Sequence, residues 1–346
     1  MNPNTRKLHD LGQRLWLDNI TRQLLGSGTL AHYISELSVT GLTSNPTLFE
    51  HAIGSSASYD EAIQKAVAQG LSGEDLFFEL ALQDLTQAAD LFRPTFDSTN
   101  GADGWVSLEV SPLLAHDTIN TIRAAVQLHA RAARPNLFIK IPGTPAGIPA
   151  IEQSIFDGVP INVTLLFSRE HYVAAAEAYL RGIERRLAAG LDPKVESVAS
   201  LFVSRWDVAV KDEISPQFQN RLGIAIAMRT YKGYRDLLAS ERWRKLAASG
   251  ARPQRLLWAS TGTKDPAANQ TPTSRPWRQR TRSPRFPRRP CLVFPITGTS
   301  VQACPPMVAM LNPSLRSSGA RASTLKRSPR SCSAKASRRL PRRGAG

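Results

Sequence analysis

Cysteine is absent from residues 1–266, because Cys291, Cys304 and Cys332 all lie nearer the C-terminus. That part of the chain can therefore form neither a disulfide nor a thiolate metal site. The chain also lacks an uninterrupted apolar run of about 18 residues, which a membrane-spanning helix needs, and an apolar signal segment near its start. We expect a cytoplasmic protein that does not enter a membrane.

Acidic residues are absent from residues 267–346, which hold 15 Arg and 2 Lys. Residues 1–266 hold the other 27 basic residues against 28 acidic ones, so the formal charge of +16 belongs to the tail. The tail also contains 11 of the 24 prolines. Such a composition cannot bury enough apolar surface to offset the entropy of ordering, so we expect a disordered tail after a nearly neutral folded body.

Short apolar segments alternate with amphipathic helical ones through residues 1–266. The candidate strands are Leu15–Leu17, Ser38–Leu42, Trp105–Val110, Leu137–Ile141, Ile161–Phe167, Val198–Val203 and Leu256–Ser260. Helices are expected from Ser72 to about Phe92, from Ser168 to near Gly190, and over Ile214–Leu238 with a break near Gly233. Such alternation indicates parallel βαβ units and predicts an α/β protein with a (β/α)₈ barrel. The alternative is a doubly wound sheet, but no glycine-rich phosphate-binding fingerprint follows any strand.

Lys140 interrupts the apolar strand Leu137–Ile141, just before a Pro-Gly turn. On a strand it shares a face with Phe138. An ammonium in a packed interior loses hydration, and the amine can then act as a nucleophile toward a carbonyl. The alternative is a lysine at a strand edge whose ammonium reaches water.

Polar residues also end the other candidate strands, where barrel enzymes place their chemistry. The set comprises Asp18, Asn45, Glu109, Asn162, Thr164, Ser200, Arg205 and Ser260. Structural explanations exist for several of them: Asp18 could cap a helix that begins at Asn19, and Asn45-Pro46 is a common turn dipeptide. Serine and threonine often fill barrels, and Arg205 could belong to a surface ion pair. Glu109 inside a strand is harder to explain structurally, because buried carboxylates need partners.

These segments together resemble the transaldolase family, the class I aldolases of the pentose phosphate pathway. The matching segments are Thr43–Pro46, Ser107–Val110, Phe138–Pro142, Ile161–Ser168, Ser200–Arg205 and Leu257–Lys264, in order and one per strand. The resemblance covers about residues 1–266. It implies a (β/α)₈ barrel that transfers a dihydroxyacetone unit from a ketose phosphate to an aldose phosphate through a lysine Schiff base.

The resemblance also implies a role for each polar residue. Lys140 would form the Schiff base, Glu109 and Thr164 would hold the catalytic water, and Asp18 would move the proton during carbon–carbon cleavage. Asn45, Asn162 and Ser200 would bind the dihydroxyacetone unit, and Arg205 and Ser260 the substrate phosphate. One departure is Gly262, where some members have an arginine; Lys264 could replace only its charge.

The family resemblance implies sugar phosphates as partners, no metal or organic cofactor, and a possible homo-oligomer. A class I aldolase that releases its product without transfer is the rival enzyme. Binding of the basic tail to nucleic acid is physically feasible, but we do not favour it.

The family pattern stops after Lys264-Asp265-Pro266, before the eighth strand and its closing helices. We expect a barrel over 1–266 that lacks its eighth strand and exposes two strand edges. A natural extension would follow an essential element of the barrel and not replace it. A reading-frame shift near residue 267 in a GC-rich gene accounts better for the Arg, Pro and Ser content.

We predict that another reading frame beyond codon 266 encodes an Ala/Leu/Glu-rich continuation, and that the 346-residue product folds poorly and has little activity. Translation of the other two frames checks the first expectation. Normal turnover of fructose 6-phosphate with erythrose 4-phosphate by the 346-residue protein would contradict the second.

Overall fold

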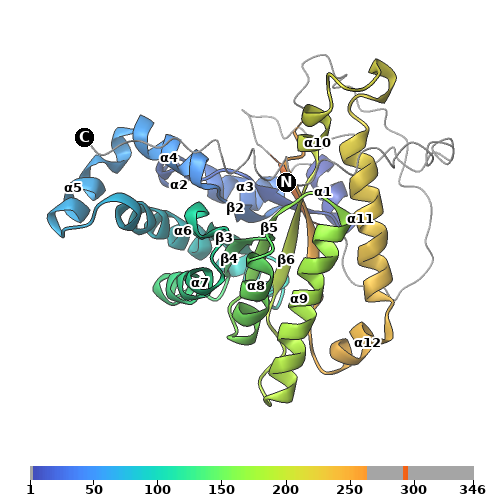
Figure 1. Ribbon diagram of the computed structural model, residues 1–346. Helices are drawn as coiled ribbons and strands as arrows, with labels where there is room; N and C mark the ends of the chain where they lie inside the picture. Colours follow the sequence, from blue (N-terminus) through green and yellow to red (C-terminus); the bar gives the residue numbers. More distant parts are fainter. Residues whose placement is uncertain (1–2, 263–290, 295–346) are drawn as a thin grey trace.

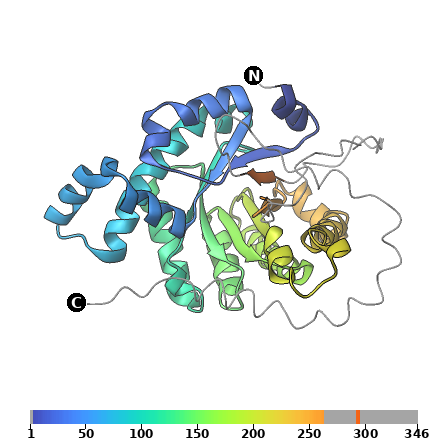
Figure 2. The same ribbon diagram turned by 90° about the horizontal axis from the view of Figure 1, so that it is seen from above.

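A computed structural model describes residues 3–262 and 291–294, and its strands close into a single parallel barrel in chain order (Figures 1 and 2). The strands are β1 Arg14–Leu17, β2 Val39–Thr43, β3 Trp105–Glu109, β4 Leu137–Pro142, β5 Ile161–Leu166, β6 Ser197–Phe202, β7 Arg255–Ala259 and β8 Cys291–Phe294. All seven strands expected within residues 1–266 are present, with ends displaced by no more than one residue. The predicted (β/α)₈ class is confirmed.

The eighth strand corrects one expectation from the sequence. Cys291–Phe294 pairs in parallel with β1 on one side and with β7 on the other, so neither strand is left as an open edge (Figure 2). The run Cys-Leu-Val-Phe is the length of a short strand but has no alternation of polar and apolar residues. Period-two alternation therefore did not indicate a strand at residues 291–294. The expected disorder of the rest of the tail concerns residues outside those that the structure describes.

Helices surround the barrel, and α4 and α5 extend away from one side of it (Figure 1). They are α1 Pro3–Asp10, α2 Arg22–Gly26, α3 Thr29–Leu37, α4 Pro46–Ser55, α5 Asp60–Ala68, α6 Gly73–Ser98, α7 Thr118–Ala132, α8 Gly147–Phe156, α9 Arg169–Ala188, α10 Ser204–Ala209, α11 Leu222–Leu238 and α12 Glu241–Ala248, with 3₁₀ turns at η1 Ala57–Tyr59, η2 Pro112–Leu114 and η3 Pro216–Phe218.

Local helix signals were only partly correct. Ser168 caps α9 through the backbone N–H of His171, as expected. Ser72 is the N-cap residue of α6, but its side chain makes no capping bond, and α6 continues to Ser98. The break expected near Gly233 is wrong, because α11 runs through it. A Cβ at Gly233 would lie 3.2 Å from Nε of Arg169, so close packing against α9 explains this glycine.

Aromatic side chains fill the middle of the barrel. Trp105 and Phe138 stack with their ring centroids 4.0 Å apart, and Trp16 stacks on the other side of Phe138 at 6.2 Å. A Cβ at Gly41 would lie 2.5 Å from the Trp16 indole, so β2 carries a glycine where that ring needs space. The middle of the barrel is thus a packed apolar layer.

A buried ionic group closes the barrel below this layer. Asp103 accepts from Nε of Arg14 on β1 at 2.7 Å and from Nη1 of Arg255 on β7 at 3.0 Å. Burial alone raises the pKa of Asp103, but Arg255 and Arg14 more than offset that effect and hold the pKa of this carboxyl below its usual range. The triad links the strands on either side of β8 to the start of β3.

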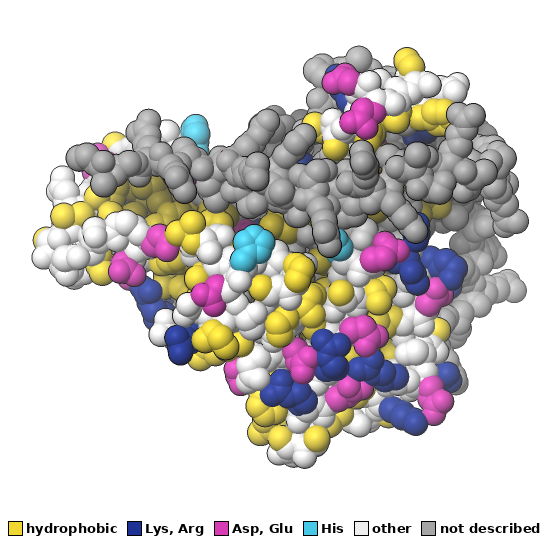
Figure 3. Space-filling model, in the orientation of Figure 1, with side chains coloured by type: hydrophobic (Ala, Val, Ile, Leu, Met, Phe, Trp, Pro, Cys, Tyr) yellow, Lys and Arg dark blue, Asp and Glu magenta, His cyan; other side chains and the backbone are white. Residues whose placement is uncertain are grey.

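The surface charges of the folded part are mixed. Figure 3 shows basic and acidic side chains interspersed over the lower part of the visible face. Some are paired: Arg242 donates to Glu177 and Glu184, and Arg181 donates to Glu152. The sequence-based division into a nearly neutral body and a basic tail is consistent with this surface. Within the described residues, no helix combines the length and apolar character needed to cross a membrane.

We predict that Asp103→Asn lowers the free energy of unfolding by about 3–5 kcal/mol at neutral pH, because two buried guanidinium groups lose their carboxylate. The lowered pKa stabilises the fold at any pH above the ordinary value near 4, and that stabilisation is lost as pH falls through the folded-state pKa. The difference between wild type and variant in urea unfolding should therefore shrink below about pH 4.

The matched control is Asp90→Asn, because Asp90 pairs with Arg134 at 2.6 Å but its side chain is 56% exposed. We expect it to cost less than about 1 kcal/mol. An Asp103→Asn difference that stays constant from pH 7 to pH 3 would contradict the linkage.

Candidate active site

The lysine on β4 lies inside the barrel and is paired with a carboxylate. Lys140 Nζ is 2.9 Å from Oε2 of Glu109, and the two side chains are 8% and 16% exposed. Lys140 therefore does not reach bulk water at a strand edge, and that alternative is wrong. Phe138, two residues earlier, belongs to the aromatic layer beneath it.

The register of the parallel strands brings Glu109 and Lys140 together. Glu109 on β3 is the direct partner of Lys140 on β4, and Lys140 is the partner of Asn162 on β5. Successive side chains on a strand alternate between faces, so partners in register point to the same side of the sheet. A carboxylate, an ammonium and an amide consequently stand in a row across three neighbouring strands.

Asn162 is fully buried and bound on both sides of its amide. Its Nδ2 donates to Oγ of Ser107 at 3.0 Å, and its Oδ1 accepts from Oγ of Ser200 at 2.7 Å. Both ends of the amide are therefore satisfied by serine hydroxyls, which can donate as well as accept. Ser200 was expected at the site, whereas Ser107 was noted only as a residue on the same face as Glu109.

A backbone carbonyl completes the surroundings of the lysine. Lys140 Nζ donates to the carbonyl oxygen of Ser44 at 3.1 Å, and Thr43 Oγ1 donates to the same oxygen at 3.4 Å. The Ser44 hydroxyl in turn donates to the Ser107 carbonyl at 2.9 Å. Sequence analysis missed Ser44, because every residue has a carbonyl group and only the path of the chain decides which one meets the lysine.

Thr164 lies further along β5 and is fully buried. Its Oγ1 has no hydrogen-bond partner among the described residues. The pairing of β5 with β6 is irregular between Val163 and Leu166, and Leu165 has a left-handed φ of 57°. A branched side chain rarely adopts that conformation, which concentrates at functional sites.

Asp18 follows β1 directly and is half-buried. It does not cap a helix starting at Asn19, because α2 begins later and its N-cap is Thr21, whose hydroxyl accepts from the N–H of Leu24. The local pattern was misleading, because Thr21 is also a favourable capping residue and directly precedes the first residue of the helix.

Arg22 holds the loop after β1 against α6. Its Nε donates to Oδ1 of the buried Asp84 at 2.9 Å, and Tyr59 donates to the other oxygen at 2.7 Å. Burial raises the pKa of Asp84, although its hydrogen bonds to Tyr59 and Arg22 oppose that effect. The segment after β1 is thus anchored four residues beyond Asp18 by a buried polar group outside the barrel.

Asn45 follows β2 and acts as the N-cap of α4. Its Oδ1 accepts from the N–H of Leu48 at 2.8 Å, and Pro46 occupies the first helical position. The structural explanation weighed for Asn45-Pro46 was a turn, whereas the structure begins a helix there and uses the side-chain oxygen of Asn45 as its cap. The side-chain nitrogen of Asn45, Nδ2, makes no hydrogen bond to another described residue.

The expected phosphate-binding residues lie at the ends of β6 and β7. Ser260 Oγ is 3.0 Å from Oγ of Ser204, and Arg205 is the exposed residue that follows Ser204 on α10. Ser260 has a left-handed φ of 52°. Gly262 is half-buried beside them, whereas Lys264 lies outside the described residues.

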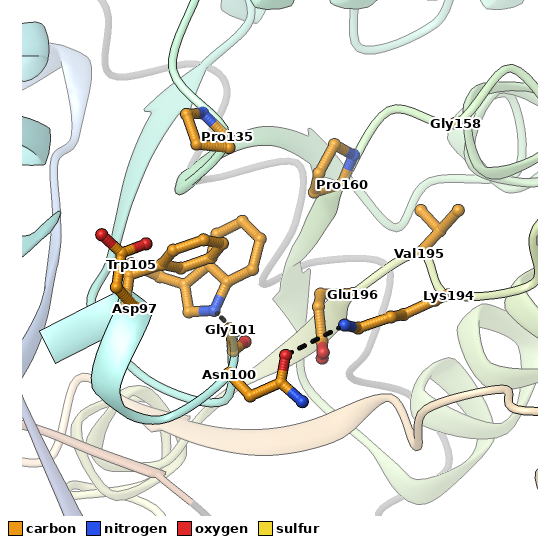
Figure 4. A pocket seen from close by; sticks show the side chains of 11 residues that line it. Asp97, Asn100, Gly101, Trp105, Pro135, Gly158, Pro160, Lys194, Val195 and Glu196 are labelled. Carbon is orange, nitrogen blue, oxygen red and sulfur yellow. Dashed lines mark hydrogen bonds between the residues drawn. The ribbon is translucent and has the colours of Figure 1, made fainter.

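A cavity of about 280 Å³ lies at the opposite end of the barrel (Figure 4). Its lining residues precede the strands; Pro135 comes before β4 and Pro160 before β5. Lys194 reaches across it to Asn100 Oδ1 at 3.2 Å, and Glu196 pairs with Arg252 at 3.2 Å. These polar groups already bind one another, and this end of a barrel contributes to stability more often than to chemistry. We therefore take the surroundings of Lys140, and not this cavity, as the candidate active site.

The site at Lys140 offers an amine, a carboxylate and several fixed hydroxyl and amide groups. Such a set suits proton transfer and covalent attack on a carbonyl. Within residues 3–262 and 291–294, no group of three or more His, Cys, Asp or Glu side chains is arranged to hold a metal ion.

Comparison with known proteins gives a consistent result. The family model described as "Transaldolase/Fructose-6-phosphate aldolase" matches residues 15–272. A transaldolase of Saccharopolyspora erythraea is 44% identical over 276 residues, which cover 78% of this chain and 75% of that protein. Transaldolase 2 of Nostoc punctiforme is 42% identical over 281 residues, covering 76% and 74%, and transaldolase 1 of Streptomyces avermitilis is 43% identical over 276 residues, covering 78% and 73%.

Proposed function

The chain belongs to the transaldolase/fructose-6-phosphate aldolase family, and from that premise we propose that it transfers a dihydroxyacetone unit between sugar phosphates through a Schiff base on Lys140. The donors would be sedoheptulose 7-phosphate or fructose 6-phosphate, and the acceptors glyceraldehyde 3-phosphate or erythrose 4-phosphate. The observation that supports this most is the enclosed pair of Lys140 and Glu109 at 2.9 Å.

Imine formation requires a neutral amine, and Glu109 is placed to accept the proton that Lys140 must lose. The amine then attacks the ketone carbonyl, and water leaves to give a protonated imine. That imine withdraws electrons from the bond between the carbons α and β to the imine carbon. Cleavage of this bond leaves an enamine on Lys140 instead of a free carbanion. The enamine attacks the acceptor aldehyde, and hydrolysis releases the new ketose.

We assign the remaining roles by position in the barrel. Glu109 and Thr164 would hold the water that enters and leaves, which suits the unpartnered hydroxyl of Thr164. Asp18 would accept the hydroxyl proton during cleavage and return a proton later. Asn162 and Asn45 would bind the dihydroxyacetone hydroxyls.

Ser200 would contribute to substrate binding by holding the Asn162 amide, to which it already donates. The substrate phosphate would lie near Arg205 and Ser260. An exposed guanidinium beside two hydroxyl groups supplies both charge and hydrogen bonds to a phosphate. We place the reaction in the cytoplasm, as the composition suggests.

A class I aldolase that releases free dihydroxyacetone is the second candidate, since the description of the matching family includes fructose-6-phosphate aldolase. Both reactions share the Schiff base and differ in the fate of the enamine. Dependence of fructose 6-phosphate consumption on added erythrose 4-phosphate would favour transfer. Release of dihydroxyacetone without an acceptor would favour cleavage.

The expectation of low activity was based in part on two exposed strand edges. That premise is wrong, because β8 pairs with both neighbouring strands. Low activity itself remains a prediction, as does the reading-frame shift, because both concern residues outside the described ranges.

We predict that borohydride with fructose 6-phosphate reduces an imine and attaches the sugar carbons to Lys140. Peptide mass mapping should find the added mass on the peptide that contains Lys140, and Lys140→Met should abolish labelling. Lys194→Met, which removes an exposed lysine at the opposite end of the barrel, should label normally. Labelling at another lysine, or none in folded wild-type protein, would contradict the Schiff-base proposal.

We predict that Glu109→Gln lowers the transfer rate by about 10²–10⁴-fold, because an amide cannot take the proton from the amine or return it to the leaving water. Steady-state assays with erythrose 4-phosphate as acceptor measure this. Glu74→Gln is the control, because Glu74 accepts from Ser111 Oγ at 2.6 Å just beyond the end of β3 without forming an ion pair with Lys140. Equal rates for the Glu109 and Glu74 variants would contradict the role of Glu109.

A further inference from the structure

Ser44 meets the reactive amine through its backbone and meets β3 through its side chain. Its carbonyl accepts from Lys140 Nζ at 3.1 Å, and its hydroxyl donates to the Ser107 carbonyl at 2.9 Å. The residue is 4% exposed and lies between β2 and the N-cap of α4. Lys140 Nζ thus has two partners at once: it donates to the Ser44 carbonyl, and it forms an ion pair with the Glu109 carboxylate.

The hydrogen count of the reaction allows only one of these contacts to persist. An ammonium group carries three hydrogens. When it condenses with a ketone to give a protonated imine and water, two of those hydrogens leave in the water molecule and one stays on Nζ. The positive charge is conserved, and no oxidant or reductant is needed. The imine nitrogen can therefore donate to the Ser44 carbonyl or to Glu109, but not to both.

We propose that Ser44 is a positioning residue, whose tethered carbonyl keeps the single N–H of the imine and so leaves Glu109 available to move protons to and from water. This inference rests on the proposed Schiff base. Glu109 must first take a proton from the ammonium and then deliver it to the departing hydroxyl of the carbinolamine. A carboxylate still bound to the imine N–H would be held away from that second step.

The fixed position of the Ser44 carbonyl follows from its neighbours. The hydroxyl bond to Ser107 ties this turn to β3, the strand that also carries Glu109. Thr43 Oγ1 donates weakly to the same carbonyl, and Pro46 restricts the backbone that follows. Lys140 is thereby contacted by Glu109, which lies on β3, and by the carbonyl of Ser44, whose side chain is hydrogen-bonded to β3.

The test compares Ser44→Ala with Ser44→Thr, which keeps a hydroxyl donor. Ser44→Ala retains the carbonyl but loses the bond that holds it, so imine formation should slow about three- to tenfold, the effect of one ordinary hydrogen bond. Single-turnover borohydride trapping with fructose 6-phosphate measures this rate. We expect KM for the ketose to change less than about twofold, because Ser44 is not assigned to the sugar. Ser44→Thr should restore most of the rate.

The matched control is Ser197→Ala at the other end of the barrel. Ser197 also donates its hydroxyl to the carbonyl of a neighbouring strand, Ile161, at 2.7 Å. We expect a comparable fall in melting temperature and an unchanged trapping rate. Ser44→Cys, which keeps the size and weakens the donor, replaces Ser44→Ala if the alanine variant does not fold, and should also slow trapping.

Two results would overturn the role of Ser44: trapping of Ser44→Ala at the wild-type rate, or equal slowing by Ser197→Ala. Absence of wild-type trapping at Lys140 would overturn the Schiff base and this inference with it. Normal wild-type trapping with an unchanged Ser44→Ala variant would overturn the inference alone.

Discussion

The site depends on the register between β3, β4 and β5. Glu109, Lys140 and Asn162 are direct partners across these strands, and parallel pairing turns their side chains to the same face. A shift of any one strand by one residue would turn its polar side chain to the opposite face and place an apolar residue inside. The ion pair at 2.9 Å is therefore a consequence of strand pairing as much as of electrostatic attraction.

The rest of the barrel interior holds this register in place. The stacked rings of Trp105 and Phe138 lie on the same two strands as Glu109 and Lys140, four and two residues earlier in the sequence, respectively. Tightly packed rings resist sliding of β3 against β4, since close-packed interiors deform little. Below them, Asp103 joins β1 and β7 through two arginines. Polarity is thus divided along the barrel axis, with an ionic base, an aromatic middle and a polar upper layer that contains Lys140 and Glu109.

Closure of the barrel depends on a strand of only four residues, Cys291–Phe294. The four residues of β8 lie in a part of the chain whose composition is unlike the rest, yet they pair with both β1 and β7. Backbone hydrogen bonds do not depend on side-chain identity, so any short apolar segment that can reach the gap is able to pair there. The residues of the candidate site come from β1 to β7 and from the segments that follow these strands.

Much of the fold and site followed from residues 1–262 alone, and the reasons are local. Period-two alternation placed the seven strands to within one residue and put Lys140, Glu109, Asn162, Thr164 and Ser200 on inward faces. That information is carried by each segment and by its likeness to transaldolases. Polar residues at the ends of parallel strands converge whenever a barrel forms, so their meeting was also predictable.

Only the tertiary structure decided which groups touch. It selected the Ser44 carbonyl as a hydrogen-bond acceptor of Lys140, made Thr21 and not Asp18 the helix cap, and placed the Arg169 side chain close to Gly233 within the unbroken helix α11. It also showed that Cys291–Phe294 closes the barrel. In each case the deciding partner is either distant in the sequence or a backbone atom common to all residues. Side-chain patterning along the sequence therefore determined the strands and the polar residues that face the barrel interior, while the distances between strands and loops determined their contacts.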